Sequence, residues 1–165
     1  MQWRSVKEAR CSVARALSVV GERWTMLILR EAFLGHRRFD EFQAATGIAR
    51  NILSTRLQAL VAKGIFERND DGPERHVEYR LTEKGLDLYP VLISLMRWGD
   101  TWMAGEEGPP LTLVHRECGH STKPALTCSH CHGAIEVRAM QAIVAPHSAP
   151  AKRHHRERAN QRRSS

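Results

Sequence analysis

Glycine residues divide the first part of the chain into short segments, and this punctuation constrains the fold more than any other feature. Gly21, Gly35, Gly47 and Gly64 each follow a run with apolar residues at helical spacing. Glycine is the residue found most often just past a helix C-terminus. The pattern therefore predicts helices over residues 12–20, 22–34, 39–46 and 50–63, joined by brief turns.

The pattern changes after the last of these helices. Residues 65–68 predict a strand, residues 69–74 form a polar turn, and residues 76–81 alternate apolar and polar side chains. Together they predict a β-hairpin. Thr82 can then cap a helix over residues 83–103. Pro90 is expected either to kink this helix or to split it into two.

The predicted helix over residues 83–103 is apolar on two faces. A helix of this kind is normally buried on both sides. In a small domain we expect the second side to meet another subunit. The two stripes are Leu86, Tyr89, Ile93 and Met96, and Leu88, Val91, Leu95, Trp98 and Trp102.

The rest of the chain divides by composition. Residues 11–104 form the predicted folded domain, residues 105–110 a linker, and residues 111–137 a compact Cys/His-rich segment. Residues 145–165 are rich in Ala, Pro, Ser, His and Arg without apolar periodicity, which predicts a disordered tail. No internal repeat is evident in the sequence.

Charge favours an anionic partner but does not choose among nucleic acid, a membrane surface and an acidic protein. The 165 residues carry a formal charge of +7. Residues 145–165 hold six of the 25 Lys and Arg residues but one of the 18 acids. The excess is mostly a property of the tail, which is expected to add affinity without selectivity.

Location is constrained by what the sequence lacks. It contains no apolar run of about 18 residues, the length that a spanning helix needs. Residues 1–11 have no apolar signal core, so no secretory signal is expected. We expect a cytoplasmic protein whose four cysteines stay reduced, and no membrane partner.

The order of helices and hairpin is that of a winged helix-turn-helix, mainly α with a small β-hairpin wing. Residues 39–46 and 50–63 form the predicted pair, joined at Gly47. In such motifs the second helix lies in the major groove and its exposed side chains contact bases. The sequence therefore predicts that residues 50–63 recognise DNA.

The polar face of residues 50–63 carries side chains suited to reading bases. Asn51, Thr55 and Gln58 lie opposite the apolar face, with Ser54 at the edge and Arg50 at the start. Asn and Gln can pair with adenine through two hydrogen bonds, Arg with guanine, and Ser or Thr with groove edges or phosphates. The alternative is a solvated polar helix face without a ligand.

Further basic residues flank this helix. Arg37 and Arg38 precede the short helix and are candidates for phosphate contact, as are Arg75 and Arg80 on the hairpin. Acidic residues at the hairpin tip oppose this role, and the hairpin can instead be a solubilising edge. Arg56 lies nearer the apolar face, so an internal salt bridge or hydrogen bond is the alternative to DNA contact for it.

These residues resemble the HxlR group of the MarR-like winged-helix transcription regulators. The resemblance covers about residues 11–103 and departs at Ser12, where the family usually has proline. The stretches that carry it are residues 11–17, 21–24, 26–30, 38–42, 47–54, 56–60, 64–68, 77–82 and 98–99.

The resemblance implies a homodimeric, sequence-specific DNA-binding regulator that dimerises through its N-terminal segment and the helix over residues 83–103. It implies a pseudo-palindromic operator. Some members sense oxidants or electrophiles through the cysteine that Cys11 matches, which needs an accessible thiolate. Lys7, Arg10 and Arg15 are near in sequence and can lower its pKa. The alternative is a small hydrophobe at a dimer interface, and any inducer remains open.

The Cys/His-rich segment predicts a possible structural Zn²⁺ site. Cys128 and Cys131 have the spacing of a zinc knuckle, and Cys118 with His120 supplies the other half of a Cys₃His set. Cys118 and His120 are separated by one residue rather than two. Competing ligands are His115, His130 and His132, and the alternative is a metal-free hairpin.

Two other functions compete with the regulator. A thiol- or zinc-dependent enzyme would use the Cys/His-rich segment, but no paired carboxylates, nucleophile–base motif or phosphate loop supports it. An RNA-associated zinc-ribbon module would use the basic tail, but the aromatics that stack single-stranded bases are missing from it. The sequence favours the regulator over both alternatives, and no enzymatic activity is expected.

Overall fold

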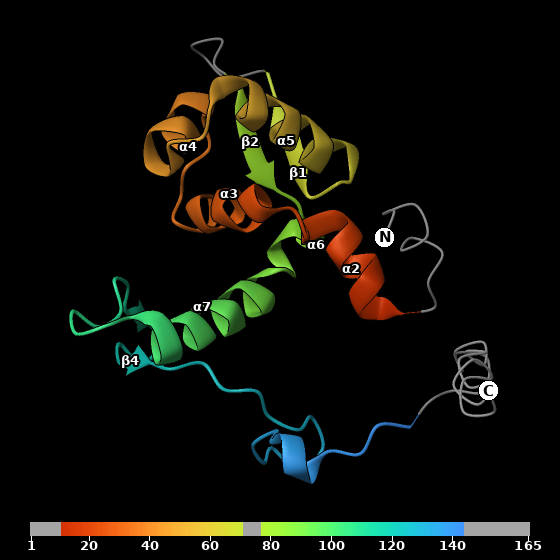
Figure 1. Ribbon diagram of the computed structural model, residues 1–165, viewed down its shortest axis with the longest axis vertical. Coiled ribbons are helices and arrows are strands. Elements are labelled where there is room, and N and C mark those ends of the chain that lie inside the picture. The colour runs from red at the N-terminus through yellow and green to blue at the C-terminus, as the bar shows by residue number, and fades with distance from the viewer. Residues whose placement is uncertain (1–10, 71–76, 144–165) are drawn as a thin grey trace, which may run out of the picture.

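The computed structural model describes residues 11–70 and 77–143, and its elements are labelled in Figure 1. The mainly helical fold, with a small hairpin after the helix pair, is the predicted winged helix-turn-helix. No helix in the described part is long and apolar enough to cross a membrane. The elements are α2 (Ser12–Val20), α3 (Arg23–Phe33), α4 (Phe39–Thr46), α5 (Arg50–Ala62), β1 (Phe66–Asn69), β2 (Glu78–Leu81), α6 (Glu83–Leu86), α7 (Tyr89–Met103), β3 (Leu113–Val114), β4 (Ser121–Thr122) and the 3₁₀ turn η1 (Val137–Ala139).

The hydrophobic core lies between α3, α4, α5 and the start of the hairpin. Phe42 of α4 and Phe66 of β1 meet edge to face, with ring centroids 6.1 Å apart. Burying one such side chain stabilises the fold by about 1.5–3 kcal/mol. The largest fully buried side chains are Ile28, Leu29, Phe42, Ile48, Leu53, Leu57, Leu60, Ile65 and Phe66.

The wing is the antiparallel pair β1–β2, with Phe66 opposite Leu81 and Asn69 opposite Glu78. The strands begin one and two residues later than predicted, and residues 71–76 between them lie outside the described part. The connector before α4 adds to the wing, since the Tyr79 amide donates to the Arg37 carbonyl over 2.8 Å. The wing and the start of α4 are therefore one connected unit.

The predicted helix over residues 83–103 is two helices, α6 and α7. Pro90 lies in the first turn of α7, where its missing N–H leaves no helical hydrogen bond unmade. The buried residue of α7 is Leu92, which is 4% exposed and belonged to neither predicted stripe. Much of the second stripe stays exposed in the single chain, with Trp98 at 57% and Trp102 at 74%.

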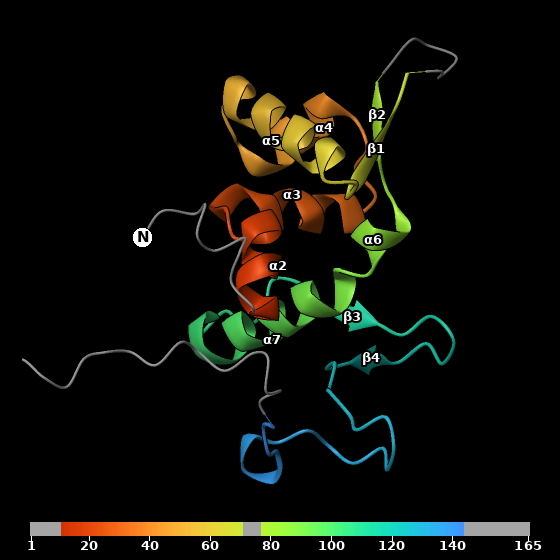
Figure 2. The ribbon, with the colours of Figure 1, turned by 90° about the vertical axis from the view of Figure 1, so that its right-hand side faces the viewer.

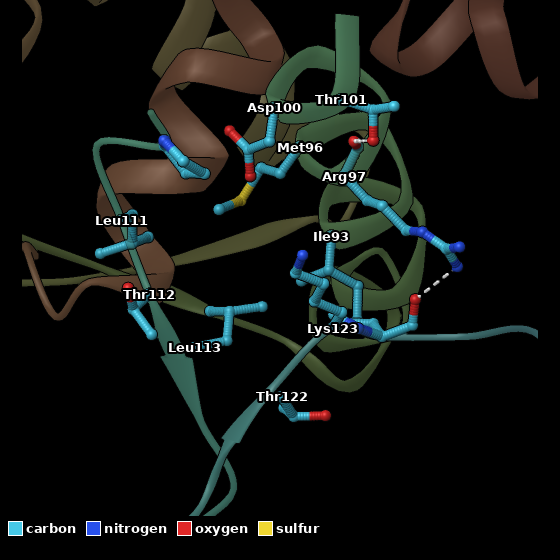
Figure 3. Close-up of a pocket in the computed structure, with 12 residues that line it drawn as sticks. Ile93, Met96, Arg97, Asp100, Thr101, Leu111, Thr112, Leu113, Thr122 and Lys123 are labelled. Carbon is cyan, nitrogen blue, oxygen red and sulfur yellow. Dashed lines mark hydrogen bonds between the residues drawn. The ribbon is translucent and has the colours of Figure 1, made fainter. Parts of the chain in front are cut away.

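Helices α2 and α7 lie on the side of α3 that faces away from α4 and α5, as Figures 1 and 2 both show. The segment after α7 returns along it, because Nη1 of Arg97 donates to the Pro124 carbonyl over 2.8 Å. A cavity of about 430 Å³ lies between this segment and α7, lined in part by Ile93, Met96 and Leu113 (Figure 3).

One junction connects the end of α5, the wing and α6. The Thr82 amide donates to the Ile65 carbonyl over 3.1 Å, and the Thr82 hydroxyl donates to the Gly64 carbonyl over 2.7 Å. The same hydroxyl accepts from the Gly85 amide and so caps α6, as predicted. Gly85 is buried there, and a Cβ at this position would overlap the Ile65 carbonyl oxygen.

We predict that Gly85→Ala destabilises the fold by about 1–3 kcal/mol, because the added carbon forces α6 away from Ile65. The midpoint of thermal unfolding should fall. Gly99→Ala is the matched control, since an added Cβ in α7 meets nothing within 4 Å. It should be neutral or stabilising by up to about 1 kcal/mol. Equal midpoints for Gly85→Ala and the unchanged protein would contradict the close approach.

Candidate nucleic-acid interface

The helix-turn-helix is formed by α4 and α5 around one left-handed residue. Gly47 has a φ of 67°, a conformation that side chains with a Cβ rarely adopt. The next residue, Ile48, is 1% exposed and fixes the turn to the core. On α5, Leu53, Leu57 and Leu60 are buried one turn apart, so the opposite face of α5 is held toward solvent.

That outer face carries the predicted base-reading residues. Asn51, Thr55 and Gln58 are exposed, and Ser54 is half-buried at the edge. The Thr55 hydroxyl donates to the Asn51 carbonyl over 2.8 Å, and the Gln58 amide lies 3.4 Å from the Ser54 hydroxyl. The structure therefore brings these four residues onto one surface, where two carboxamides can meet base edges.

Arg50 is held by α4. Its Nη1 lies 2.8 Å from Oε1 of Gln43 and 3.1 Å from Oδ1 of Asp40, and its guanidinium stacks 4.8 Å from the centre of the Phe39 ring. Arg50 is thus at the start of the outer face but already paired. Its three partners were not recognised from the sequence, since contacts between two different helices have no sequence spacing that predicts them.

The basic connector before α4 has a fixed backbone. The Glu41 carboxylate accepts hydrogen bonds from the amides of Arg37 and Arg38, both over 2.8 Å. These two bonds lower the pKa of Glu41 from its ordinary value. The side chains of Arg37 and Arg38 are exposed beside the wing. Glu41 was also missed, although an acid three residues after a helix N-cap is a recognisable signal.

A buried carboxylate holds the start of this connector. Glu31 on α3 is 3% exposed and pairs with Arg30 and with Nδ1 of His36, the latter over 3.1 Å. A buried charge is tolerated where such partners satisfy it. The Glu31–His36 contact links α3 to the connector, because His36 directly precedes Arg37.

The charges on the wing largely pair with one another. Arg80 donates to the Glu78 carboxylate over 2.9 and 3.0 Å, and Arg68 donates to Asp70 over 2.9 Å. Arg80 is still half-exposed. Arg75 lies outside the described residues, so its predicted role stays a prediction.

Arg56 does not belong to the outer face. Its Nε lies 3.3 Å from Oε2 of Glu22, the N-cap residue of α3, and both side chains are 33% exposed. This is the internal ion pair that the sequence left open as the alternative to DNA contact. Arg56 fixes α5 to α3 and is unsuited to base recognition.

Cys11 precedes α2 and occupies its N-cap position. The residue is exposed, and its carbonyl accepts from the Arg15 amide over 3.0 Å. The Arg15 side chain lies 3.4 Å from the Ser12 hydroxyl. Lys7 and Arg10, the other predicted neighbours, lie outside the described residues. The geometry leaves the thiol accessible to small oxidants.

The predicted zinc ligands lie in two separate turns. Cys118 lies 3.4 Å from Nδ1 of His115, whereas Nδ1 of His120 contacts the Cys118 carbonyl over 2.7 Å. Across residues 11–70 and 77–143, no three His, Cys, Asp or Glu side chains are arranged to hold a metal ion.

The second turn holds Cys128 and Cys131. Hydrogen bonds from the Cys131 amide, the His130 amide and the Cys131 side chain lower the pKa of the Cys128 thiol. The His130 amide lies 3.4 Å from Cys128 Sγ. Amides aimed at sulfur favour the thiolate, which is the form that binds metal.

Comparison with known proteins places these features in one family. The model of the HxlR-like helix-turn-helix family matches residues 19–107. An uncharacterized HTH-type transcriptional regulator of Mycobacterium tuberculosis, Rv3095, is 52% identical over 129 residues, covering 77% of this chain and 81% of the relative. The Bacillus subtilis regulator YvaP is 34% identical over 92 residues, covering 54% of this chain and 84% of the relative.

Solved structures agree with this result. The crystal structure of PA1607, provisionally assigned as a transcription factor, has a TM-score of 0.75 and 36% identity, and the match covers 84% of this chain and 98% of that one. The redox regulator HypR in its reduced form has a TM-score of 0.52 and 31% identity, with coverage of 55% and 92%.

The relatives are DNA-binding regulators rather than enzymes. Together with the helix-turn-helix and its outward polar face, the match shows that the chain belongs to the HxlR-like helix-turn-helix family of transcription regulators.

Proposed function

We propose that this transcription regulator acts as a homodimer on a pseudo-palindromic operator and reads bases with the outer face of α5. The observation that carries the proposal is the stripe of Asn51, Thr55 and Gln58, which the buried Leu53 and Leu57 hold toward solvent. The carboxamides of Asn51 and Gln58 lie about two helical turns apart on the same face. Each can make paired hydrogen bonds with adenine in the major groove.

Support for a homodimer comes from the apolar residues that α2 and α7 expose. Monomeric proteins rarely expose a contiguous large apolar patch, and such patches mark interaction sites. These two helices lie on the same side of the molecule in Figures 1 and 2, opposite the recognition helix. The exposed residues are Val13, Leu17, Val91, Leu95, Trp98, Trp102 and Met103.

In a homodimer built on α2 and α7, a twofold axis relates the two copies of α5. Dimeric helix-turn-helix proteins bind half-sites about one helical turn apart, so the operator mirrors the protein's symmetry. Arg37 and Arg38 are exposed and lie beside the wing, since the Arg37 carbonyl accepts from the Tyr79 amide. We assign them to phosphate contact, together with Arg75 and Arg80 of the wing.

We expect Gln58→Ala to weaken operator binding about tenfold or more, because losing one paired contact to a base costs about 1–3 kcal/mol. Gln141→Ala is the matched control, since Gln141 is also exposed but lies far along the chain from α5. Binding is measured by fluorescence anisotropy on operator and scrambled duplexes at one salt concentration. Equal loss on both duplexes would assign Gln58 to backbone contact, and no loss would overturn the role of this face.

We expect Trp98→Glu to convert the dimer into monomers, because a carboxylate replaces a large exposed apolar side chain on α7. Val137→Glu is the control, since Val137 is 90% exposed but lies in η1 rather than on α2 or α7. Light scattering after size exclusion gives the mass of each variant. A monomeric unchanged protein, or a dimeric Trp98→Glu variant, would contradict the dimer.

We further propose that Cys11 responds to oxidants. It is exposed at the N-cap of α2, and α2 belongs to the proposed dimer face. Oxidation there would change how the two subunits meet. A structural relative, HypR, is described as a redox regulator and is known in a reduced and an oxidised form.

Treatment with diamide should lower the operator affinity of the unchanged protein by at least about tenfold, the lower range of allosteric coupling. The Cys11→Ser variant should keep its affinity. Ser12→Ala serves as the control, since Ser12 is exposed beside Cys11 and its substitution leaves the thiol in place. Equal responses of the Cys11→Ser variant and the unchanged protein would refute sensing by Cys11.

A further inference from the structure

The C-terminal segment contains a structural repeat of 13 residues. The first unit is a hairpin with Val114 opposite Ser121, and the second has Thr127 opposite Ala134. Each hairpin encloses a six-residue turn, residues 115–120 and residues 128–133. The sequence hides this repeat because few residue types are shared between the units.

The two turns make the same backbone hydrogen bonds. In the first, the His115 amide donates to the His120 carbonyl over 2.9 Å and the Gly119 amide donates to the His115 carbonyl over 2.8 Å. In the second, the Cys128 amide donates to the Gly133 carbonyl over 2.8 Å and the His132 amide donates to the Cys128 carbonyl over 2.9 Å.

The backbone torsions of the turns repeat as well. The fifth residue of each turn has a positive φ, 70° at Gly119 and 58° at His132. His132 is the one residue other than glycine with a positive φ in the described part. A conformation this unfavourable persists where the surrounding structure requires it. The second turn therefore keeps the shape of the first without its glycine.

This equivalence changes the predicted ligand set. His115 occupies the position of Cys128, and Cys118 occupies the position of Cys131, so both turns have ligands three residues apart. His120 corresponds to Gly133, which has no side chain, and its Nδ1 contacts the Cys118 carbonyl instead. The single residue between Cys118 and His120 is then no departure from the spacing of a zinc knuckle, because His120 is not one of the ligands.

Each turn already brings its two ligands together. Nδ1 of His115 lies 3.4 Å from Cys118 Sγ. In the second turn, the Cys131 side chain hydrogen-bonds to the Cys128 side chain, and the His130 amide donates to Cys128 Sγ over 3.4 Å. Hydrogen bonds of this kind fix the orientation of a metal ligand. Each turn is thus half of a tetrahedral site.

We propose that His115, Cys118, Cys128 and Cys131 bind one Zn²⁺ that clamps the two turns together. Three sulfurs and one imidazole are a structural zinc set with no open position for a substrate. Each cysteine binds as thiolate and gives its proton to solvent. The metal has a structural role, and it ties the segment that packs on α7 to the segment after it.

A short linker joins the two hairpins. In Figures 1 and 2 the loop between β3 and β4 lies apart from the segment that leads to η1. The paired residues of the two hairpins are joined through residues 123–125, and each turn begins directly after its own pair. Binding of one metal ion by both turns therefore requires a bend at this linker, and that bend is part of the proposal.

The surface of the second hairpin agrees with closure. Leu113 of the first hairpin is half-buried against α7, whereas its equivalent Leu126 is 58% exposed. Ile135, which pairs with Leu126, is 41% exposed, and Val114 of the first hairpin is 56% exposed. Closing the two turns around a metal ion would let these apolar side chains cover one another.

The test uses the full chain, purified under reducing conditions. We expect one Zn²⁺ per chain by native mass spectrometry and elemental analysis. Replacement by Co²⁺ should give the visible absorption of a tetrahedral site and a sulfur-to-cobalt charge-transfer band. A chain that binds no metal at micromolar Zn²⁺ with all four thiols reduced would overturn the proposal.

The ligand set is tested by two histidine variants. His115→Ala should weaken Zn²⁺ binding by more than about 100-fold, since even groups that only orient a ligand are worth 10–100-fold. His120→Ala is the matched control and should keep both the affinity and the cobalt spectrum. The reverse result, with His120→Ala losing the metal and His115→Ala keeping it, would refute the assignment. Unchanged circular dichroism of both variants separates loss of a ligand from loss of the fold.

Discussion

The arrangement of the whole molecule depends on the contact between the Ile65 carbonyl and α6. Residue 65 ends the connection from the recognition helix and begins the wing, while Thr82 and Gly85 begin the path to α7. Only a residue without a side chain at Gly85 allows α6 to approach this carbonyl. One point of the backbone thus sets the angles among the recognition helix, the wing and the helix proposed to hold the partner subunit. The recognition helix, the wing and the path to α7 are thus joined through a few hydrogen bonds.

In the winged-helix head, residues 11–104, charged side chains act mainly on their neighbours and do not give the surface a general positive charge. Most of the chain's excess positive charge lies in residues 145–165, outside the described residues. Within the head, several arginines are matched by acids, as Arg56 is by Glu22 and Arg80 by Glu78. A nearly balanced head makes weak non-specific contact with phosphates, because that contact grows with the number of charges it neutralises. In the proposed function, selectivity then rests on the polar face of α5.

The sequence predicted the helices well because their boundaries follow from local chemistry. The leucines of α5 repeat at helical spacing, and Thr82 has the residue type that caps a helix. Contacts between distant elements were not predictable in this way. Leu92 was missed because the sequence pattern assigned its neighbours Val91 and Ile93 to the two apolar stripes and left Leu92 out. The partners of Arg50 were missed because they lie on another helix. His115 was named only as a competitor, because its equivalence to Cys128 is a property of backbone hydrogen bonds and not of residue identity.

The pairing of Arg50 makes its approach to DNA an exchange of partners. A guanine or phosphate that takes this guanidinium must replace Oε1 of Gln43 and Oδ1 of Asp40. A group that offers two acceptors can replace both, whereas a group that offers one leaves a donor or an acid unmatched. The enthalpy of contact is then small for the right partner and unfavourable for the wrong one. Arg50 would act as a filter against sites that cannot match it, which is a different task from adding affinity.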